Sequence, residues 1–348
     1  MRLVQMMDAR RGRPERRVGV VEGETIRDLT AGHPEWQRVV DLFRDAQRAG
    51  STVEDLVGGT NYREAAVTLE YDALLRSRPG VGAVWLLSPV DHPDPAHCLI
   101  TGTGLTHLGS MAQRDGMHKA AADASAPKTD SQRMFERGLE GGRPARGVRG
   151  VSPEWFYKGT GHILRGPNDW LDVPPYGLDC GEEPEIVGCY IIGEDGAPYR
   201  LGFTVGNEWA DHAFERINYL YLAHSKLCNC SLGPELVTDE PFRDIRGVCR
   251  ISRGDEVLYD SGELLTGEDH MCHNLANMED HHFKHAQFRV PGDVHLHFFG
   301  TMKLSYGHRG VLQDGDRIEI AFDRMGPPLV NYVRCIPRDD APVAVRRA

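Results

Sequence analysis

Two glutamates one residue apart, Glu183 and Glu185, open an apolar run that ends near residue 193. In a β-strand these two side chains point to the same face. Neighbouring carboxylates repel each other, and burying them is costly unless something compensates their charge. From this spacing alone, a solvated pair on an edge strand is the favoured interpretation.

A third glutamate, Glu208, changes that interpretation, because it ends a second apolar run. The sequence Glu194-Asp195-Gly196 between the runs is a turn signal and predicts an antiparallel hairpin. The hairpin brings Glu208 beside the first pair. Three carboxylates on one face match an octahedral Mg²⁺ or Mn²⁺ site that keeps positions for water or a chelating ligand. The sequence therefore predicts a metal site formed by Glu183, Glu185 and Glu208.

The elements around this hairpin predict a mixed, β-rich α+β fold with a small N-terminal α/β domain. Residues 1–94 contain two short strand patterns, an amphipathic helix over 36–50 and a second helix candidate over 63–75. Residues 95–340 are richer in strands and lack regular βαβ alternation. Helices are expected there at 108–124, 130–142, 212–226 and 273–288, and a second hairpin at 248–262. Residues 341–348 are expected to form a tail.

Composition excludes several classes of function. The net charge of −11 argues against binding to a nucleic-acid backbone, which needs a concentrated basic face. No stretch reaches the ~18 apolar residues of a membrane span, and the first residues lack the apolar core of a signal peptide. The eight cysteines include no CxxC pair, and Cys228 and Cys230 are expected to be reduced thiols. A cytoplasmic enzyme fits these features.

An ordered set of short motifs resembles the fumarylacetoacetate hydrolase superfamily over residues 98–335. The match rests on the following pieces: Gly104-Leu105-Thr106, the Pro-Glu-x-x-x-Lys strand from Pro153 to Lys158, Glu183-Pro184-Glu185, Gly206-Asn207-Glu208, Leu232-Gly233-Pro234, Gly300-Thr301-Met302 and Gly315-Asp316. The resemblance implies a catalytic domain of the superfamily's β-rich roll or sandwich type. It also implies a Mg²⁺ or Mn²⁺ cofactor, a small 2-keto acid as substrate, and a homodimer or dimer of dimers.

The chain departs from the family pattern at two places. The third metal carboxylate is usually aspartate but is Glu208 here, and Trp209-Ala210-Asp211-His212 replaces the usual Ser-Ala-Arg-Asp. In the lid helix, C–C bond hydrolases of the family carry a histidine base where this chain has Ser110. Ser110 followed by Arg114 is similar to the family's dehydratases of 2-keto-3-deoxy-pentonates.

The resemblance also implies roles for individual residues. Glu154 and Lys226 are expected to perform acid–base work, because a partly buried lysine beside a metal can have a lowered pKa. The residues expected to bind substrate are Thr106, Ser110, Arg114, Lys158 and Thr301. The alternatives are an ordinary salt bridge between Glu154 and Lys158, a surface charge at Lys226, and a solvated helix face at Ser110 and Arg114.

Three functions stay open at this point. The first is a Mg²⁺-dependent dehydratase, a lyase, acting on a 2-keto-3-deoxy sugar acid in carbohydrate metabolism. The second is a hydrolase of a C–C bond in a diketo acid, with His107 as its base. The third is a non-catalytic protein that binds a sugar acid. His281 and His285 lie one helical turn apart and offer a second possible metal site, and His295 or His297 is a candidate for lining the substrate pocket.

Overall fold

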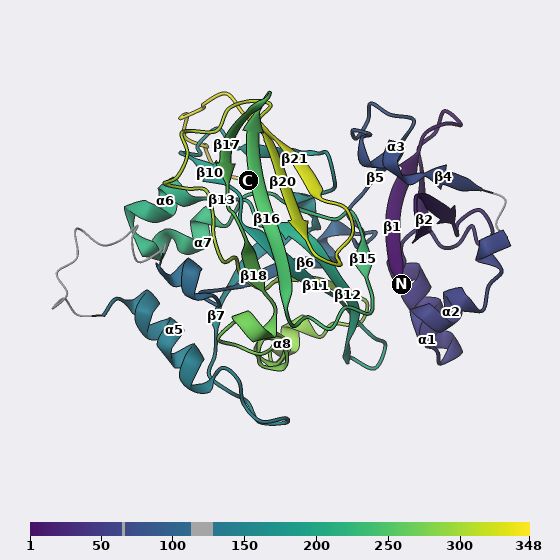
Figure 1. Cartoon of the computed structure of the whole chain (residues 1–348), viewed down its shortest axis with the longest axis horizontal. Coiled ribbons are helices and arrows are strands. Elements are labelled where there is room, and N and C mark those ends of the chain that lie inside the picture. The colour runs from purple at the N-terminus through teal and green to yellow at the C-terminus, as the bar shows by residue number, and fades with distance from the viewer. Residues whose placement is uncertain (65–66, 113–127) are drawn as a thin grey trace.

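The computed structural model of the chain describes residues 1–64, 67–112 and 128–348 (Figure 1). A thirteen-stranded sheet runs through the molecule, and a six-stranded sheet lies against it. The main path of the large sheet is β4 (Thr68–Glu70), β3 (Thr25–Asp28), β2 (Glu15–Glu22), β1 (Arg2–Asp8), β15 (Leu236–Val237), β12 (Pro198–Asn207), β11 (Pro184–Ile192), β19 (Val294–Phe298), β6 (Cys98–Gly104) and β7 (Glu154–Thr160). Its side strands are β5 (Val84–Leu86), β8 (Leu164–Arg165) and β14 (Cys230–Leu232).

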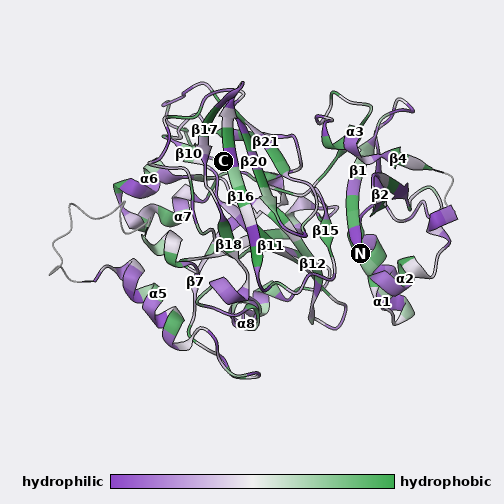
Figure 2. Cartoon of the chain, in the orientation of Figure 1, coloured by the Kyte–Doolittle hydropathy of each residue, from purple (hydrophilic) through white to green (hydrophobic). Residues whose placement is uncertain are grey.

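The six-stranded sheet comprises β17 (Glu256–Asp260), β16 (Ile245–Arg253), β20 (Arg317–Phe322), β21 (Leu329–Cys335), β9 (Trp170–Val173) and β18 (Leu264–Thr266). A separate pair is formed by β10 (Cys180–Gly181) and β13 (Ala210–Asp211). One large apolar cluster joins β11 and β12 to β16 and β20, so the core lies between the two sheets. Figure 2 shows hydrophobic residues concentrated on these central strands. The β-rich α+β class predicted from sequence is confirmed.

Helices surround the sheets. They are α1 (Val39–Ala49), α2 (Val53–Gly58), α3 (Tyr71–Leu75), α5 (Asp130–Gly141), α6 (His212–Ile217), α7 (Leu222–Ser225) and α8 (Leu275–Phe283), and residues 108–112 are also helical. Short 3₁₀ turns are η1 (Tyr62–Glu64), η2 (Pro95–His97), η3 (Gly161–Ile163), η4 (Tyr219–Tyr221), η5 (Glu268–His270) and η6 (Ala286–Phe288). Among the described residues, none of the helices combines the length and apolar character that a membrane span needs.

The hairpin predicted at 185–208 is formed by β11 and β12. All nine residues of β11 are buried, because one face packs on the six-stranded sheet and the other on α1 and its neighbours. Pro184 lies opposite Asn207, and Glu185 lies opposite Gly206. A Cβ on Gly206 would come within 2.4 Å of Val187, so this close approach requires glycine.

Two helix predictions were wrong. Residues 63–75 were expected to form one helix, but Thr68–Glu70 extend as β4 and pair with β3. The α-helix α3 begins only at Tyr71, and Arg63 and Glu64 belong to the 3₁₀ turn η1. The helix expected over 212–226 is broken into α6, η4 and α7. Asn218 is extended, with φ −161°, and its side chain accepts a hydrogen bond from the Leu220 N–H to start the next turn.

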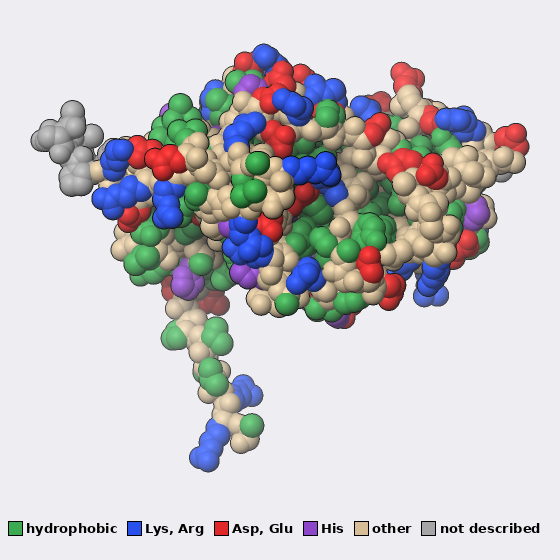
Figure 3. All heavy atoms as spheres, turned by 90° about the horizontal axis from the view of Figure 1, so that it is seen from below, with side chains coloured by type: hydrophobic (Ala, Val, Ile, Leu, Met, Phe, Trp, Pro, Cys, Tyr) green, Lys and Arg blue, Asp and Glu red, His purple; other side chains and the backbone are tan. Residues whose placement is uncertain are grey.

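The sheet crosses the expected domain boundary at residue 94. Strand β1 belongs to the N-terminal unit, at the right of Figure 1, yet it pairs with β15 through Leu3 and Leu236. The division into residues 1–94 and 95–340 stays a prediction. Residues 341–348 form no helix or strand and are exposed throughout. The space-filling view of Figure 3 shows a narrow chain segment that extends away from the rest of the molecule.

Several histidines lie in the core in their neutral form. His295 and His297 share one face of β19, and both meet His282 on α8. The Nδ1 atom of His297 lies 2.7 Å from Thr101 Oγ1. Burial lowers the pKa of His295 and of His297 to about 3. Neither residue lines the cavity described below, although one of them was a candidate to do so.

These histidines predict a loss of stability in mild acid. Unfolding releases His297 to a pKa near 6.5, so the unfolded chain binds its proton first as pH falls below that value. The stability linked to this one residue then falls by about 1.4 kcal/mol per pH unit, from pH 6.5 towards pH 3. Urea unfolding at pH 6.5, 6.0, 5.5 and 5.0 should therefore show a steeper pH dependence for the wild type than for His297→Asn. Equal slopes would show that His297 does not titrate on unfolding.

Candidate metal centre

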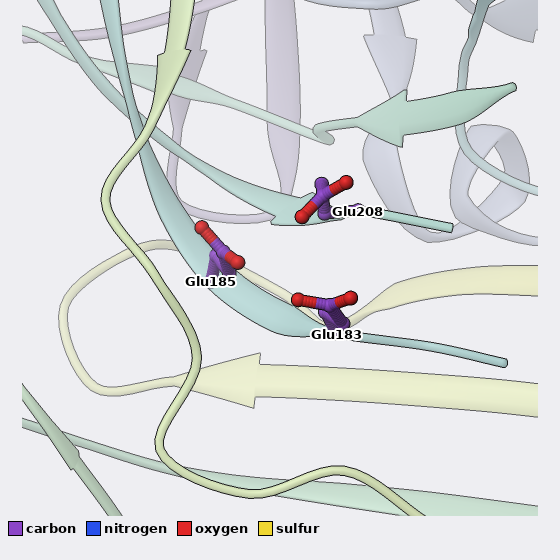
Figure 4. Close-up of side chains that lie close together, drawn as sticks. All are labelled: Glu183, Glu185 and Glu208. Atoms are coloured by element: carbon purple, nitrogen blue, oxygen red, sulfur yellow. The ribbon is translucent and has the colours of Figure 1, made fainter. Parts of the chain in front are cut away.

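Three buried glutamates converge at the end of the β11–β12 hairpin. Glu183 precedes β11, Glu185 is its second residue and Glu208 follows β12. The Glu208 N–H donates to the Glu183 carbonyl at 3.0 Å and fixes the two ends of the hairpin together. One carboxylate oxygen from each residue lies within 4.8 Å of the others, and Figure 4 shows the three side chains facing a common point. The predicted cluster is present.

The charges of these carboxylates conflict in the absence of a cation. Burial, followed by the charges of Glu208 and Glu183, raises the pKa of Glu185 well above its usual value. Burial and Glu183 likewise raise the pKa of Glu208. For Glu183, burial opposes ionisation but is outweighed by Lys226 and His212, which hold its pKa low. Three convergent carboxylates are a donor set that fits a hard divalent cation such as Mg²⁺ or Mn²⁺.

Two buried lysines support the cluster. Lys226 Nζ lies 2.5 Å from Glu183 Oε1 and 2.7 Å from Glu208 Oε2. Lys158 Nζ contacts Glu208 Oε1 at 3.1 Å and donates to the carbonyl oxygens of Trp209 and Lys226 at 2.6 and 2.9 Å. Burial favours a lower pKa for Lys226, but Glu183 and Glu208 outweigh it and raise that pKa. The lowered pKa expected for this lysine beside a bound metal stays a prediction.

A cavity opens over the cluster, and some of the predicted residues line it. Besides the three glutamates, its walls include Ser110, Phe156, Lys226, Gly300, Thr301 and Leu304. Ser110 Oγ donates to the His107 carbonyl at 2.9 Å, and Thr301 Oγ1 donates to the Lys303 carbonyl at 2.8 Å. Arg114 lies outside the described residues.

Three other predicted residues do not line the cavity. Lys158 lies behind Glu208, with its ammonium group held as described above. Glu154 lies on β7 opposite Gly104, which does line the cavity. Thr106 Oγ1 donates to the Phe299 carbonyl at 2.8 Å and supports the turn at Gly300. The contacts of Lys158 and Thr106 are those of structural supports.

The turn at Gly300 connects directly to the metal cluster. Gly300 has φ +97°, and a Cβ there would lie 2.2 Å from Thr106 Oγ1, so a side chain cannot be accommodated. Its N–H donates to Glu185 Oε2 at 2.6 Å. Glu182, the neighbour of Glu183, accepts hydrogen bonds from the N–H and hydroxyl of Ser305 at 2.7 and 2.6 Å. These bonds hold one wall of the cavity against the hairpin.

Two buried residues of the cavity, His212 and Glu215, were not among the residues predicted from the sequence. His212 Nε2 lies 3.0 Å from Glu183 Oε1. Burial favours a lower pKa for His212, but the hydrogen bond to Glu183 and the charge of that carboxylate outweigh it and raise the pKa. Glu215 also lines the cavity, from the same helix, α6. A feature of the sequence could have identified His212 and Glu215: they follow Glu208 closely and are three residues apart, a spacing that places both on one face of a helix.

Two other histidines considered from the sequence, His281 and His107, make contacts away from the cavity. Among the described residues, side chains able to ligate a metal gather closely enough to hold an ion only at the three glutamates. His281 Nε2 lies 3.0 Å from the Gly150 carbonyl, and the possible second metal site of His281 with His285 gains no support from the described residues. His107 is buried between Thr106 and Thr266, does not line the cavity, and has its pKa lowered to about 3 by burial.

Comparisons with known proteins cover nearly the whole chain. No model of a protein family matches the chain. It is 28% identical over 317 residues to a probable 2-keto-3-deoxyxylonate dehydratase of Haloferax volcanii, covering 90% of this chain and 93% of that protein. Among solved structures, it is similar to a 2-keto-3-deoxy-D-arabinonate dehydratase complexed with magnesium and 2,5-dioxopentanoate, with a TM-score of 0.66, 18% identity, and coverage of 97% and 100%.

A second solved structure extends the comparison beyond dehydratases. Fumarylacetoacetate hydrolase from Exiguobacterium antarcticum matches with a TM-score of 0.60 and 16% identity, covering 97% of this chain and 100% of that one. Both structural matches span nearly the whole chain, including its N-terminal unit. The chain therefore has the fold of the fumarylacetoacetate hydrolase superfamily and resembles its sugar-acid dehydratase branch.

Proposed function

We propose that the protein is a Mg²⁺-dependent dehydratase that eliminates water from a 2-keto-3-deoxy sugar acid. The observation that carries this proposal is a cavity lined by three convergent glutamates and Lys226, with Ser110 in place of a histidine base. The relative from Haloferax volcanii and the magnesium-bound structural neighbour, both named as dehydratases of such acids, support the same reaction class.

Glu183, Glu185 and Glu208 would hold the cation, and Mn²⁺ can take the place of Mg²⁺ because it has a similar preference for oxygen ligands. When bound, the cation supplies a Lewis acid that polarises the keto oxygen of the substrate. Lys226 Nζ is placed to hold or move a proton at the cavity wall. Its ammonium group lies 4.9 Å from the centre of the Phe156 ring, which limits its access to water.

The second proton-transfer group is a carboxylate. Glu154 is the residue predicted from sequence, whereas Glu215 lines the cavity itself. Elimination requires a base for the C3 proton and an acid for the departing C4 hydroxyl, and a lysine with a carboxylate supplies both. Ser110 and Thr301 offer hydroxyl groups to the substrate. Arg114 stays a proposed substrate-binding residue from sequence.

In the hydrolase alternative, Ser110 stands in the cavity wall at the place where the family's hydrolases carry a histidine base. A hydrolase must deprotonate an attacking water, and a serine hydroxyl is too weak a base at neutral pH. His107 was the candidate base, but it is hydrogen-bonded behind the wall. No observation on the site favours C–C bond cleavage over dehydration.

Product analysis tests the reaction. Purified protein with Mg²⁺ is expected to convert a 2-keto-3-deoxy-pentonate to a dehydrated 2-keto semialdehyde and to leave acylpyruvates uncleaved. Chromatography with mass detection separates the products, and omission of Mg²⁺ after chelation is the control. Cleavage of an acylpyruvate into two shorter acids, without dehydration of any sugar acid, would contradict the proposal.

We also propose a homodimer or a dimer of dimers. Large apolar side chains are exposed on and beside α6, η4 and α7, including Ile217 at 62% and Leu220 at 72%. Sedimentation at micromolar concentration is expected to give at least twice the chain mass of 38.8 kDa. Leu220→Arg should shift the equilibrium towards the monomer if this surface is the interface. A wild-type protein that sediments only at 38.8 kDa would contradict this proposal.

A cytoplasmic location is proposed together with a role in carbohydrate metabolism. All eight cysteines are free thiols, as is usual for proteins of reducing compartments. The proposed substrate is a sugar acid, which places the reaction in the breakdown of sugars.

A further inference from the structure

Two of the eight free cysteines lie in contact beside the metal centre. Cys180 Sγ and Cys228 Sγ are 3.9 Å apart and buried. Cys180 lies on β10, three residues before Glu183, and Cys228 lies two residues after Lys226. No other pair of cysteine sulfurs is in such contact, and all eight cysteines belong to the described residues. The pair therefore joins the two segments that carry a metal ligand and the cavity lysine.

We propose that Cys180 and Cys228 form an oxidative modification site, in which hydrogen peroxide makes a disulfide that weakens the metal centre. This site goes beyond the proposed function, and only its effect on catalysis rests on that function. A disulfide requires the sulfurs to approach to about 2.05 Å, which is closer than their present separation by roughly 1.9 Å. Rotation of the side chains and movement of their segments must supply that difference.

The chemistry balances with peroxide as the oxidant. The Cys228 thiolate attacks one peroxide oxygen, the O–O bond breaks, and with one proton taken up the products are Cys228 sulfenic acid and one water. The Cys180 thiol then attacks the Cys228 sulfur, forming the S–S bond and releasing a second water. Two electrons pass from the two thiols to the peroxide.

The surroundings favour Cys228 as the attacking thiol. It is 7% exposed, whereas Cys180 is fully buried. The contact with Cys180 and the charge of Lys158 lower the pKa of Cys228 against the effect of burial, and the same contact and burial raise the pKa of Cys180. A thiol beside a cationic group is the more reactive nucleophile.

The link to the metal centre runs through Lys158 and Lys226. The carbonyl of Lys226, two residues from Cys228, accepts a hydrogen bond from Lys158 Nζ, which also contacts Glu208. Movement of the Cys228 segment towards Cys180 therefore disturbs the support of Glu208 and the position of Lys226. Loss of such outer supports typically lowers metal affinity by about 10- to 100-fold.

The test uses the full-length protein treated with hydrogen peroxide and then digested for mass spectrometry. A peptide linking Cys180 to Cys228, lighter by two hydrogen atoms than its separate halves, is expected in the wild type. It should disappear after dithiothreitol and be absent from Cys180→Ala and Cys228→Ala. Cys335→Ala is the matched control: Cys335 is the more exposed cysteine but has no sulfur partner, so its variant should still form the link.

Binding of Mn²⁺ gives a readout that does not depend on catalysis. The affinity of the protein for Mn²⁺ should fall by about 10- to 100-fold when the wild type or Cys335→Ala is oxidised, and it should return with dithiothreitol. Absence of the linked peptide in the wild type, or unchanged Mn²⁺ affinity in the linked protein, would overturn the inference. Failure of the reduced protein to bind Mn²⁺ would instead count against the proposed function, while the linked peptide would still be read independently.

Discussion

Replacement of Lys226 by methionine is expected to lower the turnover number by ~100- to 10,000-fold, the usual cost of losing a proton-transfer group. Lys226 is the cavity-lining residue that contacts Glu183 and Glu208 through its ammonium group. Methionine keeps most of the buried side-chain volume but removes the charge and the proton. Turnover of a 2-keto-3-deoxy-pentonate, measured at saturating Mg²⁺, gives the size of the effect.

The variant should still bind Mg²⁺, because all three carboxylates remain. Lys128→Met is the matched control, since Lys128 is exposed and, within the described part of the chain, pairs with Glu136 on α5. Its turnover should equal that of the wild type. A Lys226→Met protein that keeps wild-type turnover would remove Lys226 from the mechanism.

Replacement of Glu185 by glutamine is expected to abolish activity and Mn²⁺ binding while the fold survives. Glutamine is nearly isosteric, and its carbonyl oxygen can still accept the hydrogen bond from the Gly300 N–H. It removes one of the three charges that a divalent cation needs. Calorimetric titration with Mn²⁺ and thermal unfolding separate loss of the ion from loss of the fold.

A second buried glutamate serves as the control for this change. Glu235 accepts a hydrogen bond from Tyr71 at 2.8 Å and is not part of the metal cluster. Glu235→Gln should therefore bind Mn²⁺ as the wild type does. Normal turnover of Glu185→Gln in Mg²⁺ would show that the metal site is assigned to the wrong residues.

The hairpin and its glutamates could be predicted because the information is local. The turn at Glu194-Asp195-Gly196 closes the hairpin, and after a one-residue register shift between Cys189 and Tyr190 Glu185 lies opposite Gly206, close to Glu208. The position of Lys158 could not be derived in this way. It reaches Glu208, fifty residues later, because β7 lies at the edge of a sheet assembled from distant segments.

The failed predictions have the same origin. The pairing of β4 with β3 overrides the helical pattern of residues 63–75. The pairing of β1 with β15 joins residues more than two hundred positions apart and leaves no signal in either segment. His212 and Glu215 lie on a helix that Asn218 ends early, and the ring of His212 packs against Tyr306, which is distant in sequence.

The two lysines at the glutamate cluster have a consequence for the order of binding. The buried site holds three carboxylates and two ammonium groups, those of Glu183, Glu185, Glu208, Lys158 and Lys226. If all five are ionised, their charges sum to one unit of negative charge. The raised pKa of Glu185 favours its protonation in the absence of a cation, which brings the balance to zero. Neither balance attracts an anionic sugar acid. With a divalent cation in place the balance becomes one unit positive, and the carboxylate of the substrate brings it to zero. The count of lysines thus makes the site attractive to its substrate only after the metal has entered.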